Sequence, residues 1–467
     1  MKNQKEQGHV VVLTYPAQGH INPLLQFAKR LASKGLTTTL ATTHYTLSSI
    51  TTTPTISVQI QPVSDGYDET GFSQSPSLEA YLETFRAVGS RTLAELIVRS
   101  NDTARPVNCV VYDSLLPWAL DVARENGVCG AAFMTNSASC CSLYWRLDRG
   151  GGRVSGSGSG LMLPGVSELR IDEMPSFLNG GGQSQSQSPY LALIMEQIKR
   201  LEENDWVFCN TFDELESELV KAMQGLWPFQ MVGPMVPSAY LDQQIQGDTS
   251  YGASLWNPTN DKYMAWLNTK GPNSVIYVSF GSMADLSHKQ VEEIAWGLKA
   301  TEKHFLWVIK EPENRLPFGF LNSLGGAGMV VTWCDQLEVL SHRAVGCFVT
   351  HCGWNSTLEG LSLGVPMVAV PQWSDQPMNA KFVEEVWGVG VRAKRNEEGI
   401  VGREEVVTRV REVMEGDRSG EIGRNALKWR EAAKKAVSIG GSSDRNVDSF
   451  VEFLKGKKNE VERTEDC

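Results

Sequence analysis

One segment constrains the fold of this chain more than any other: two short apolar runs that flank a glycine turn and a helical stretch. The runs AVGCFVT, residues 344–350, and VPMVAVP, residues 365–371, are rich in β-branched residues and are typical of buried parallel strands. Between them, residues 351–353 predict a tight turn, and a helix opens at Trp354. A strand, a helix and a second parallel strand form the repeating unit of doubly wound sheets, so we predict an α/β fold.

Polar residues collect where these two predicted strands end. In open α/β sheets, ligands bind at the carboxyl ends of the strands. The helix N-terminus after the first strand offers N–H groups and a positive dipole end to an anion, and we expect Asn355, Ser356 or Thr357 to cap it. His351 adds a donor at the rim of this site, and Glu359 lies one turn into the helix, where a carboxylate can accept two ribose hydroxyls. Asp375 and Gln376 follow the second strand.

Together with Trp333, these residues supply what a sugar nucleotide requires: an aromatic surface for a base, a carboxylate for ribose, donors for a diphosphate and a polar pair for a sugar. Each residue taken alone also fits an ordinary βαβ unit, in which it caps a helix or closes a turn. From Trp333 to Gln376, however, the segment resembles the signature box of plant family-1 glycosyltransferases, which use UDP-sugars on small molecules. It has the family's 44 positions without a gap, and HCGWNS and the closing DQ are intact.

The resemblance implies two facing Rossmann-like domains, the arrangement called GT-B, and a role for each polar residue of the second domain. UDP binding is implied for a set drawn from the box and from the end of strand 275–282: Ser279, Gly281, Ser282, Trp333, Cys334, Gln336, His351, Gly353, Asn355, Ser356 and Glu359. Trp333 is expected to stack on uracil, and Gln336 and Glu359 to hold the ribose. Sugar binding is implied for Thr135, Trp354, Asp375 and Gln376, with the closing Gln favouring glucose over galactose.

Composition agrees with a large soluble enzyme and excludes several other classes. A chain of 467 residues exceeds the usual size of a single core, so two domains are expected. The formal charge of −11 argues against nucleic acid or an anionic membrane as partner. Nine cysteines without a CxxC pair indicate reduced thiols and a cytoplasmic location. The sequence shows no apolar N-terminal signal and no apolar run long enough to span a membrane, so we expect neither secretion nor a membrane span. We also expect a monomer.

The first domain is predicted to begin with strand His9–Tyr15, followed by a turn and helix entry from Pro16 to Pro23. The loop lacks the G-x-G-x-x-G dinucleotide fingerprint and presents His20 instead. Strand 107–113 ends on Asp113 at the same edge of the sheet. A histidine with a carboxylate behind it is the arrangement of a general base, although a lone loop histidine is usually an ordinary surface residue.

The same resemblance extends to this first domain. PAQGHINP matches the family's catalytic-histidine loop at His20, VVYDSLLPW matches its aspartate strand at Asp113, and Thr135 matches a position that contacts the sugar. Aromatic residues in this part of the chain are candidates for a hydrophobic acceptor pocket, although residues at such spacings are more often core. The candidates are Tyr15, Phe85, Trp118, Phe133 and Trp145, with Trp373 from the second domain.

The predicted domain ranges are 1–235 for an acceptor-binding domain, 236–257 for a linker and 258–440 for a UDP-sugar-binding domain. A helix at 441–456 is expected to pack back on the first domain, and a flexible tail follows at 457–467. Two low-complexity tracts, GGGRVSGSGSG at 150–160 and GGQSQSQS within 181–188, predict surface loops near the acceptor side.

The predicted reaction is inverting O-glucosylation of a small hydrophobic acceptor, a phenol, a steroid or terpenoid alcohol, or a carboxylic acid. UDP-glucose is the donor substrate, and no cofactor and no metal are expected, because the chain has no DxD motif. Two other classes stay open: a UDP-sugar-binding protein without activity, and a nucleotide-dependent oxidoreductase or epimerase. The first would lack the base, and the second would carry the missing glycine fingerprint.

Overall fold

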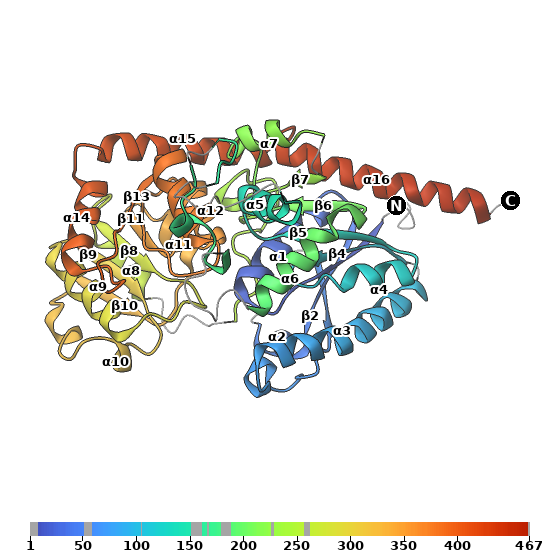
Figure 1. The fold of residues 1–467 in the computed structure, drawn as a ribbon, viewed down its shortest axis with the longest axis horizontal. Coiled ribbons are helices and arrows are strands. Elements are labelled where there is room, and N and C mark those ends of the chain that lie inside the picture. Colours follow the sequence, from blue (N-terminus) through green and yellow to red (C-terminus); the bar gives the residue numbers. More distant parts are fainter. Residues whose placement is uncertain are drawn as a thin grey trace. The chain divides into compact units, whose positions relative to one another are not determined.

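The computed structural model describes residues 8–50, 58–103, 105–150, 161–165, 168–178, 188–225, 228–255 and 262–465, with side chains as far as residue 456. The chain groups into two compact units (Figure 1). Unit 1 comprises Met1–Pro164, Gly182–Leu255 and Lys434–Cys467, and unit 2 comprises Gly165–Gly181 and Trp256–Ala433. The predicted domain ranges stay a prediction. Unlike the predicted ranges, the two units are not continuous in sequence, because Gly165–Gly181 groups with unit 2.

Unit 1 is built on a seven-stranded parallel sheet of order β3-β2-β1-β4-β5-β6-β7. Its strands are β1 (His9–Leu13), β2 (Thr37–Thr43), β3 (Val58–Val63), β4 (Val107–Asp113), β5 (Cys129–Met134), β6 (Trp206–Cys209) and β7 (Phe229–Met231). The order reverses between β1 and β4. This reversal creates the switch point at which doubly wound sheets bind ligands.

The helices of unit 1 cover the central strands. They are α1 (Gln18–Ser33), α2 (His44–Ser49), α3 (Leu78–Asn101), α4 (Ala119–Glu125), α5 (Ala138–Asp148), α6 (Pro189–Lys199) and α7 (Ser217–Met223). All five residues of β1 are buried, as expected for a strand with helices on both faces. Leu24, Phe27 and Leu31 of α1 recur at helical spacing and join Val10 and Val12 in one apolar core.

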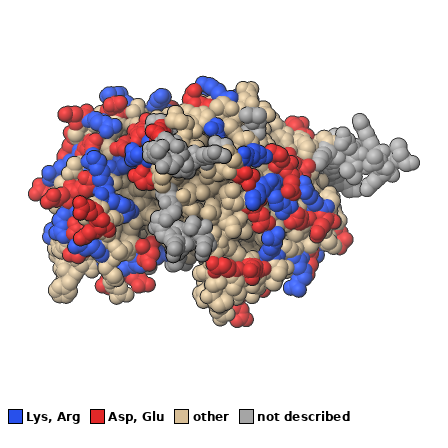
Figure 2. Space-filling view, viewed as in Figure 1, with Lys and Arg blue, Asp and Glu red and all other residues tan. Residues whose placement is uncertain are grey.

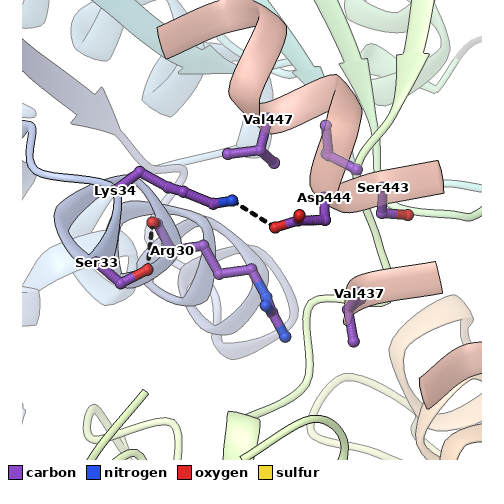
Figure 3. A pocket seen from close by; sticks show the side chains of 8 residues that line it. Arg30, Ser33, Lys34, Val437, Ser443, Asp444 and Val447 are labelled. Carbon is purple, nitrogen blue, oxygen red and sulfur yellow. Dashed lines mark hydrogen bonds and ion pairs between the residues drawn. The ribbon is translucent and has the colours of Figure 1, made fainter. Parts of the chain in front are cut away.

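The last helix, α16 (Ser442–Glu465), packs on unit 1. Its Ser443 Oγ donates a hydrogen bond to the Gly233 carbonyl at 2.5 Å, and the Phe450 ring lies edge-on to Trp206. Figure 3 shows a small surface pocket where α16 meets α1, with Lys34 reaching Asp444 at 2.5 Å across it. The predicted tail at 457–467 lies beyond the residues whose side chains are described.

Unit 2 has the same doubly wound architecture, built on a six-stranded parallel sheet of order β10-β9-β8-β11-β12-β13. The strands are β8 (Val275–Ser279), β9 (His304–Val308), β10 (Gly328–Val331), β11 (Val345–Thr350), β12 (Met367–Ala369) and β13 (Gly390–Arg392). Its helices are α8 (Lys262–Asn268), α9 (His288–Ala300), α10 (Pro312–Arg315), α11 (Gln336–Ser341), α12 (Trp354–Leu363), α13 (Gln376–Lys381), α14 (Arg403–Met414) and α15 (Ser419–Val437). The last four residues of α15 belong to unit 1. The switch point here lies between β8 and β11, and two Rossmann-like units are thus confirmed.

Two local predictions are wrong. His20 lies in the first turn of α1 and not at a loop tip, because the helix begins at Gln18 and accommodates Pro23 within it. The α12 N-cap is Gly353, and no side chain caps the helix. Asn355, Ser356 and Thr357 lie inside the first turns of α12, since the helix begins directly after the glycine.

Both glycine- and serine-rich tracts fall almost wholly outside the described residues.

The surface in view carries mixed charges. Figure 2 shows Lys and Arg interspersed with Asp and Glu over the face drawn, as expected for a chain of modest negative charge. Among the described residues, no helix is long and apolar enough to cross a membrane.

Candidate active site

The candidate base of unit 1 lies at the switch point of its sheet. Leu13 at the end of β1 pairs with Tyr112 of β4, so the residues that follow β1 lie beside Asp113. The His20 Nδ1 is 2.7 Å from Asp113 Oδ2. The Asp113 side chain is fully buried, whereas the His20 side chain keeps 20% of its surface exposed. The carboxylate therefore backs the imidazole from inside the fold, and part of the His20 side chain stays accessible.

The hydrogen bonds of Asp113 determine what His20 can do. Asp113 Oδ1 accepts the N–H of Leu115 at 2.9 Å, which orients the carboxylate toward the histidine. An ionised carboxylate only accepts hydrogen bonds, so the neutral imidazole must carry its proton on Nδ1. This tautomer leaves Nε2 as a lone-pair acceptor. A histidine in this arrangement can accept a proton from a hydroxyl, and a carboxylate behind it can stabilise the resulting imidazolium.

The first turn of α1 is also held from a distant part of the chain. Gln18 Nε2 donates to the Ala253 carbonyl at 2.8 Å, and Gln18 Oε1 accepts the Leu255 N–H at 2.8 Å. This support matters because Ala17 provides no side-chain cap and Pro23 has no N–H to bond back along the helix. Nothing in the sequence pattern marks Gln18, since its partners lie 235 and 237 residues away.

The predicted acceptor residues of unit 1 fall into two groups. Tyr15 lies edge-on to His20, with ring centroids 5.4 Å apart, and its hydroxyl is 3.2 Å from that of Tyr190. Burial, reinforced by Tyr190 and Asp113, raises the pKa of Tyr15 well above its usual range, so it stays a neutral phenol. The residues of the second group pack against other side chains: Phe85 against Trp118, Phe133 against Phe27 in the core, and Trp145 beneath Arg149. Thr135 is buried directly after β5.

In unit 2, two glycines make room for the His351 imidazole. Thr350, at the end of β11, pairs with Ser279 of β8, which brings the two following turns together. A Cβ atom on Gly281 would lie 2.7 Å from His351 Nε2, and one on Gly353 would lie 2.5 Å from it. Gly281 also has a φ of 74°, which other residues rarely adopt. Any side chain at either position would displace the ring.

The protonation state of His351 depends on its ligand. Burial lowers the pKa of His351 to about 4 and outweighs the backbone hydrogen bond of Ser279, which acts in the opposite direction. The imidazole is therefore neutral at pH 7 and offers one N–H donor. A diphosphate bound beside it would favour the charged form and raise that pKa. The N-terminus of α12 follows two residues after His351, and the N–H groups of its first turn have no acceptor within the helix.

A hydrogen-bonded cluster joins the residues predicted to hold the ribose. Gln336 Nε2 donates to Ser356 Oγ at 2.9 Å and to Glu359 Oε2 at 2.5 Å. Glu359 and Ser356 are buried, and Tyr277 donates its hydroxyl to Gln336 Oε1 at 3.1 Å. Tyr277 was not predictable as a member of this cluster because it lies within an apolar strand. The cluster orients the Glu359 carboxylate at the end of the sheet before any ligand binds.

Of the remaining members of the UDP set, Trp333 follows β10 and is half-buried, and Cys334 is buried, with its Sγ 3.4 Å from the Tyr277 hydroxyl. Asn355 lies in the first turn of α12. Ser282 accepts a hydrogen bond on its carbonyl from Lys310 at 2.7 Å. All these positions lie just beyond strand ends or at helix starts.

The predicted sugar-binding pair follows β12. Gln376 Oε1 accepts the backbone N–H groups of Gln372 and Trp373, at 2.8 and 3.0 Å. Because only the amide oxygen can accept these bonds, the Gln376 NH2 group is the part that remains as a donor for a ligand. Asp375 Oδ2 accepts from Asn379 at 2.9 Å. The pair thus combines a carboxylate acceptor with an amide donor. Trp354 is buried beside Trp387.

The fold and these two sites define a class. Two Rossmann-like units, one with a nucleotide-binding edge and one with a paired histidine and aspartate, are the composition of a GT-B glycosyltransferase. The family model for UDP-glucoronosyl and UDP-glucosyl transferases matches residues 205–422.

Comparisons with individual proteins agree. The chain is 46% identical to UDP-glycosyltransferase 74B1 of Arabidopsis thaliana, with 96% of this chain and 98% of that protein covered. It is 42% identical to the flavonol 7-O-beta-glucosyltransferase UGT74F1 of the same plant, over 97% and 100% of the two chains. The crystal structure of Os79 from O. sativa in complex with UDP superposes with a TM-score of 0.88 at 39% identity, over 95% and 100%. The chain belongs to the plant family-1 UDP-glycosyltransferases, and it is a glycosyltransferase enzyme.

Proposed function

We propose that this enzyme transfers glucose from UDP-glucose to the hydroxyl group of a small hydrophobic acceptor with inversion at the anomeric carbon. The observation that carries the proposal is the 2.7 Å contact between His20 and a fully buried Asp113 at the switch point of unit 1. It supplies the proton acceptor that an attacking hydroxyl needs. The relative named as a flavonol glucosyltransferase supports glucose as the sugar and a phenol as acceptor class.

The proposed chemistry uses few groups. His20 Nε2 takes the proton of the acceptor hydroxyl while the oxygen attacks C1 of the glucose. The bond from C1 to the UDP oxygen breaks, and UDP leaves with its charge held by His351 and the N-terminus of α12. Gln336 and Glu359 hold the ribose, and Asp375 and Gln376 the glucose hydroxyls. A carboxylic acid acceptor is compatible with the same site, but it arrives deprotonated and needs no base.

We propose that the diphosphate is bound without a metal ion. Three kinds of neutral donor support this proposal: the His351 imidazole, the Ser356 hydroxyl and the first-turn N–H groups of α12, where the helix dipole adds its positive end. Turnover is therefore expected to survive treatment with EDTA. The comparison is turnover before and after chelation, followed by addition of magnesium or manganese. Loss of activity that either ion restores would contradict metal-free binding.

The sugar-binding pair predicts a donor preference. Asp375 and the NH2 group of Gln376 form one acceptor and one donor, a pattern that a C4 epimer does not match, and unmatched polar groups are costly. UDP-glucose is expected to exceed UDP-galactose by at least about tenfold in kcat/KM. Competition kinetics with both donors measure the ratio. Equal use of the two sugars would show that this pair does not discriminate the C4 hydroxyl.

Acceptor identity calls for a screen. The protein is incubated with UDP-glucose and a panel of phenols, terpenoid alcohols and carboxylic acids, and products are identified by mass spectrometry. Glucosides of hydrophobic acceptors are the expected products. A protein that binds UDP-glucose but glucosylates nothing in such a panel would favour the inactive UDP-sugar-binding class.

Cytoplasmic location and a monomeric state belong to the same proposal. The eight described cysteines are all reduced thiols, which suits a reducing compartment.

A further inference from the structure

The loop that carries the sugar-binding pair contains a backbone conformation that needs support. Ser374 has a φ of 60°, in the left-handed region that side-chain-bearing residues seldom occupy. It directly precedes Asp375 and Gln376. The conformation turns the chain sharply between Trp373 and Asp375, and Gln376 Oε1 closes the loop by accepting the Trp373 N–H at 3.0 Å. If Ser374 relaxed to an ordinary conformation, both sugar-binding side chains would move.

A segment almost 200 residues earlier in the chain holds Ser374 on both sides of its backbone. The Ser176 N–H donates to the Ser374 carbonyl at 2.7 Å, and the Ser374 N–H donates to Ser176 Oγ at 2.7 Å. Next to this pair, the Phe177 ring lies edge-on to Trp373 at 6.0 Å. One serine therefore satisfies both polar groups of the strained residue.

The segment that bears Ser176 is itself firmly anchored within unit 2. Glu173 is buried and accepts from Lys381 at 2.9 Å and from Arg392 at 2.7 Å. Burial would raise the pKa of Glu173, but the hydrogen bonds from Arg392 and Lys381 outweigh it, so the pKa lies below its usual range. The carboxylate stays charged, and residues 168–178 form a fixed part of unit 2.

We propose that Ser176 is a positioning residue for the donor sugar: its hydroxyl holds Ser374 in the left-handed conformation that presents Asp375 and Gln376. The inference rests on the proposed function, because it assigns those two residues to the sugar. Ser176 would thus influence which donor sugar is used, although it lies outside the signature box of residues 333–376. Ser176 acts on the sugar only through the loop and has no role in binding the uridine or the diphosphate.

The test compares Ser176→Ala with Ser176→Thr, which restores a hydroxyl. Ser323→Ala is the matched control, because Ser323 is also half-buried and bonds a backbone carbonyl, that of Phe320 at 2.6 Å. Ser176→Ala is expected to lower kcat/KM for UDP-glucose roughly three- to tenfold, the effect of one neutral hydrogen bond. The preference over UDP-galactose should shrink with it, while affinity for UDP alone stays unchanged. Thr should recover most of the loss, and Ser323→Ala should behave as the unmodified enzyme.

Calorimetry keeps this test independent of turnover. UDP-glucose and UDP are titrated into each variant, and the affinity that the glucose adds should fall only in Ser176→Ala. An unchanged glucose contribution and donor preference in folded Ser176→Ala would overturn the positioning role, as would an equal loss of affinity for UDP. Failure of the proposed function would look different: the unmodified protein would transfer glucose to no acceptor.

Discussion

Replacing His20 with Ala is expected to lower turnover of an alcohol or phenol acceptor by about a hundredfold or more, the usual contribution of a general base. The substitution removes the imidazole that contacts the Asp113 carboxylate, while the residues proposed to bind UDP in unit 2 are left intact. The measurement is steady-state kinetics with saturating UDP-glucose, together with UDP affinity by calorimetry. Affinity for UDP should be largely unchanged.

His44→Ala is the matched control, because His44 is an exposed histidine of the same unit at the start of α2. It should leave turnover unaltered. A carboxylic acid acceptor provides a second control, since it needs no deprotonation and should lose less activity in the His20 variant. Turnover close to that of the unmodified enzyme with a phenol would remove His20 from the role of base.

Glu359→Ala should weaken UDP binding by roughly 1.5–3 kcal/mol, the range for lost charge-assisted hydrogen bonds. Glu359 is buried and already oriented by Gln336 at 2.5 Å, so its carboxylate is organised before ligand arrives. Calorimetric titration with UDP measures the change. The exposed Glu398 provides a control variant, Glu398→Ala, that should bind UDP normally. Unchanged affinity in a folded Glu359→Ala protein would exclude a ribose contact.

Strand positions were largely predictable from sequence because fully buried parallel strands leave a dense apolar signal. The run 107–113 coincides with β4, and residues 345–350 coincide with β11. The edge strand β3, VQIQPV, was missed because it contains a proline and alternates apolar with polar residues, as edge strands do. Since strand ends determine where loops meet, the polar clusters could be assigned to sheet edges without coordinates.

Local detail at helix starts was less predictable. The stretch from Pro16 to Pro23 looks like a turn because two prolines bracket it, yet α1 already begins at Gln18. Pro23 lies past the first turn of the helix and lacks the N–H that would bond back along it, so the start of α1 depends on outside support, with Gln18 tied to Ala253 and Leu255. Such support depends on tertiary contacts, which a local sequence pattern does not contain.

Support residues that act from far away were missed for the same reason. Tyr277 looks like part of an apolar strand, and Ser176 looks like an ordinary loop serine. Their importance comes from partners such as Gln336 and Ser374, which only the folded chain brings near. Residues that touch the ligand are concentrated in motifs, whereas residues that orient them are scattered along the chain.

In the proposed reaction, a hydroxyl activated by His20 attacks the sugar of UDP-glucose in one direct displacement. The anomeric configuration of the product tests it most directly. Glucose is α-linked in UDP-glucose, so one in-line displacement must give a β-glucoside. NMR of the product formed from UDP-glucose and a simple phenol should therefore show only the β anomer, and an α-glucoside would contradict the account.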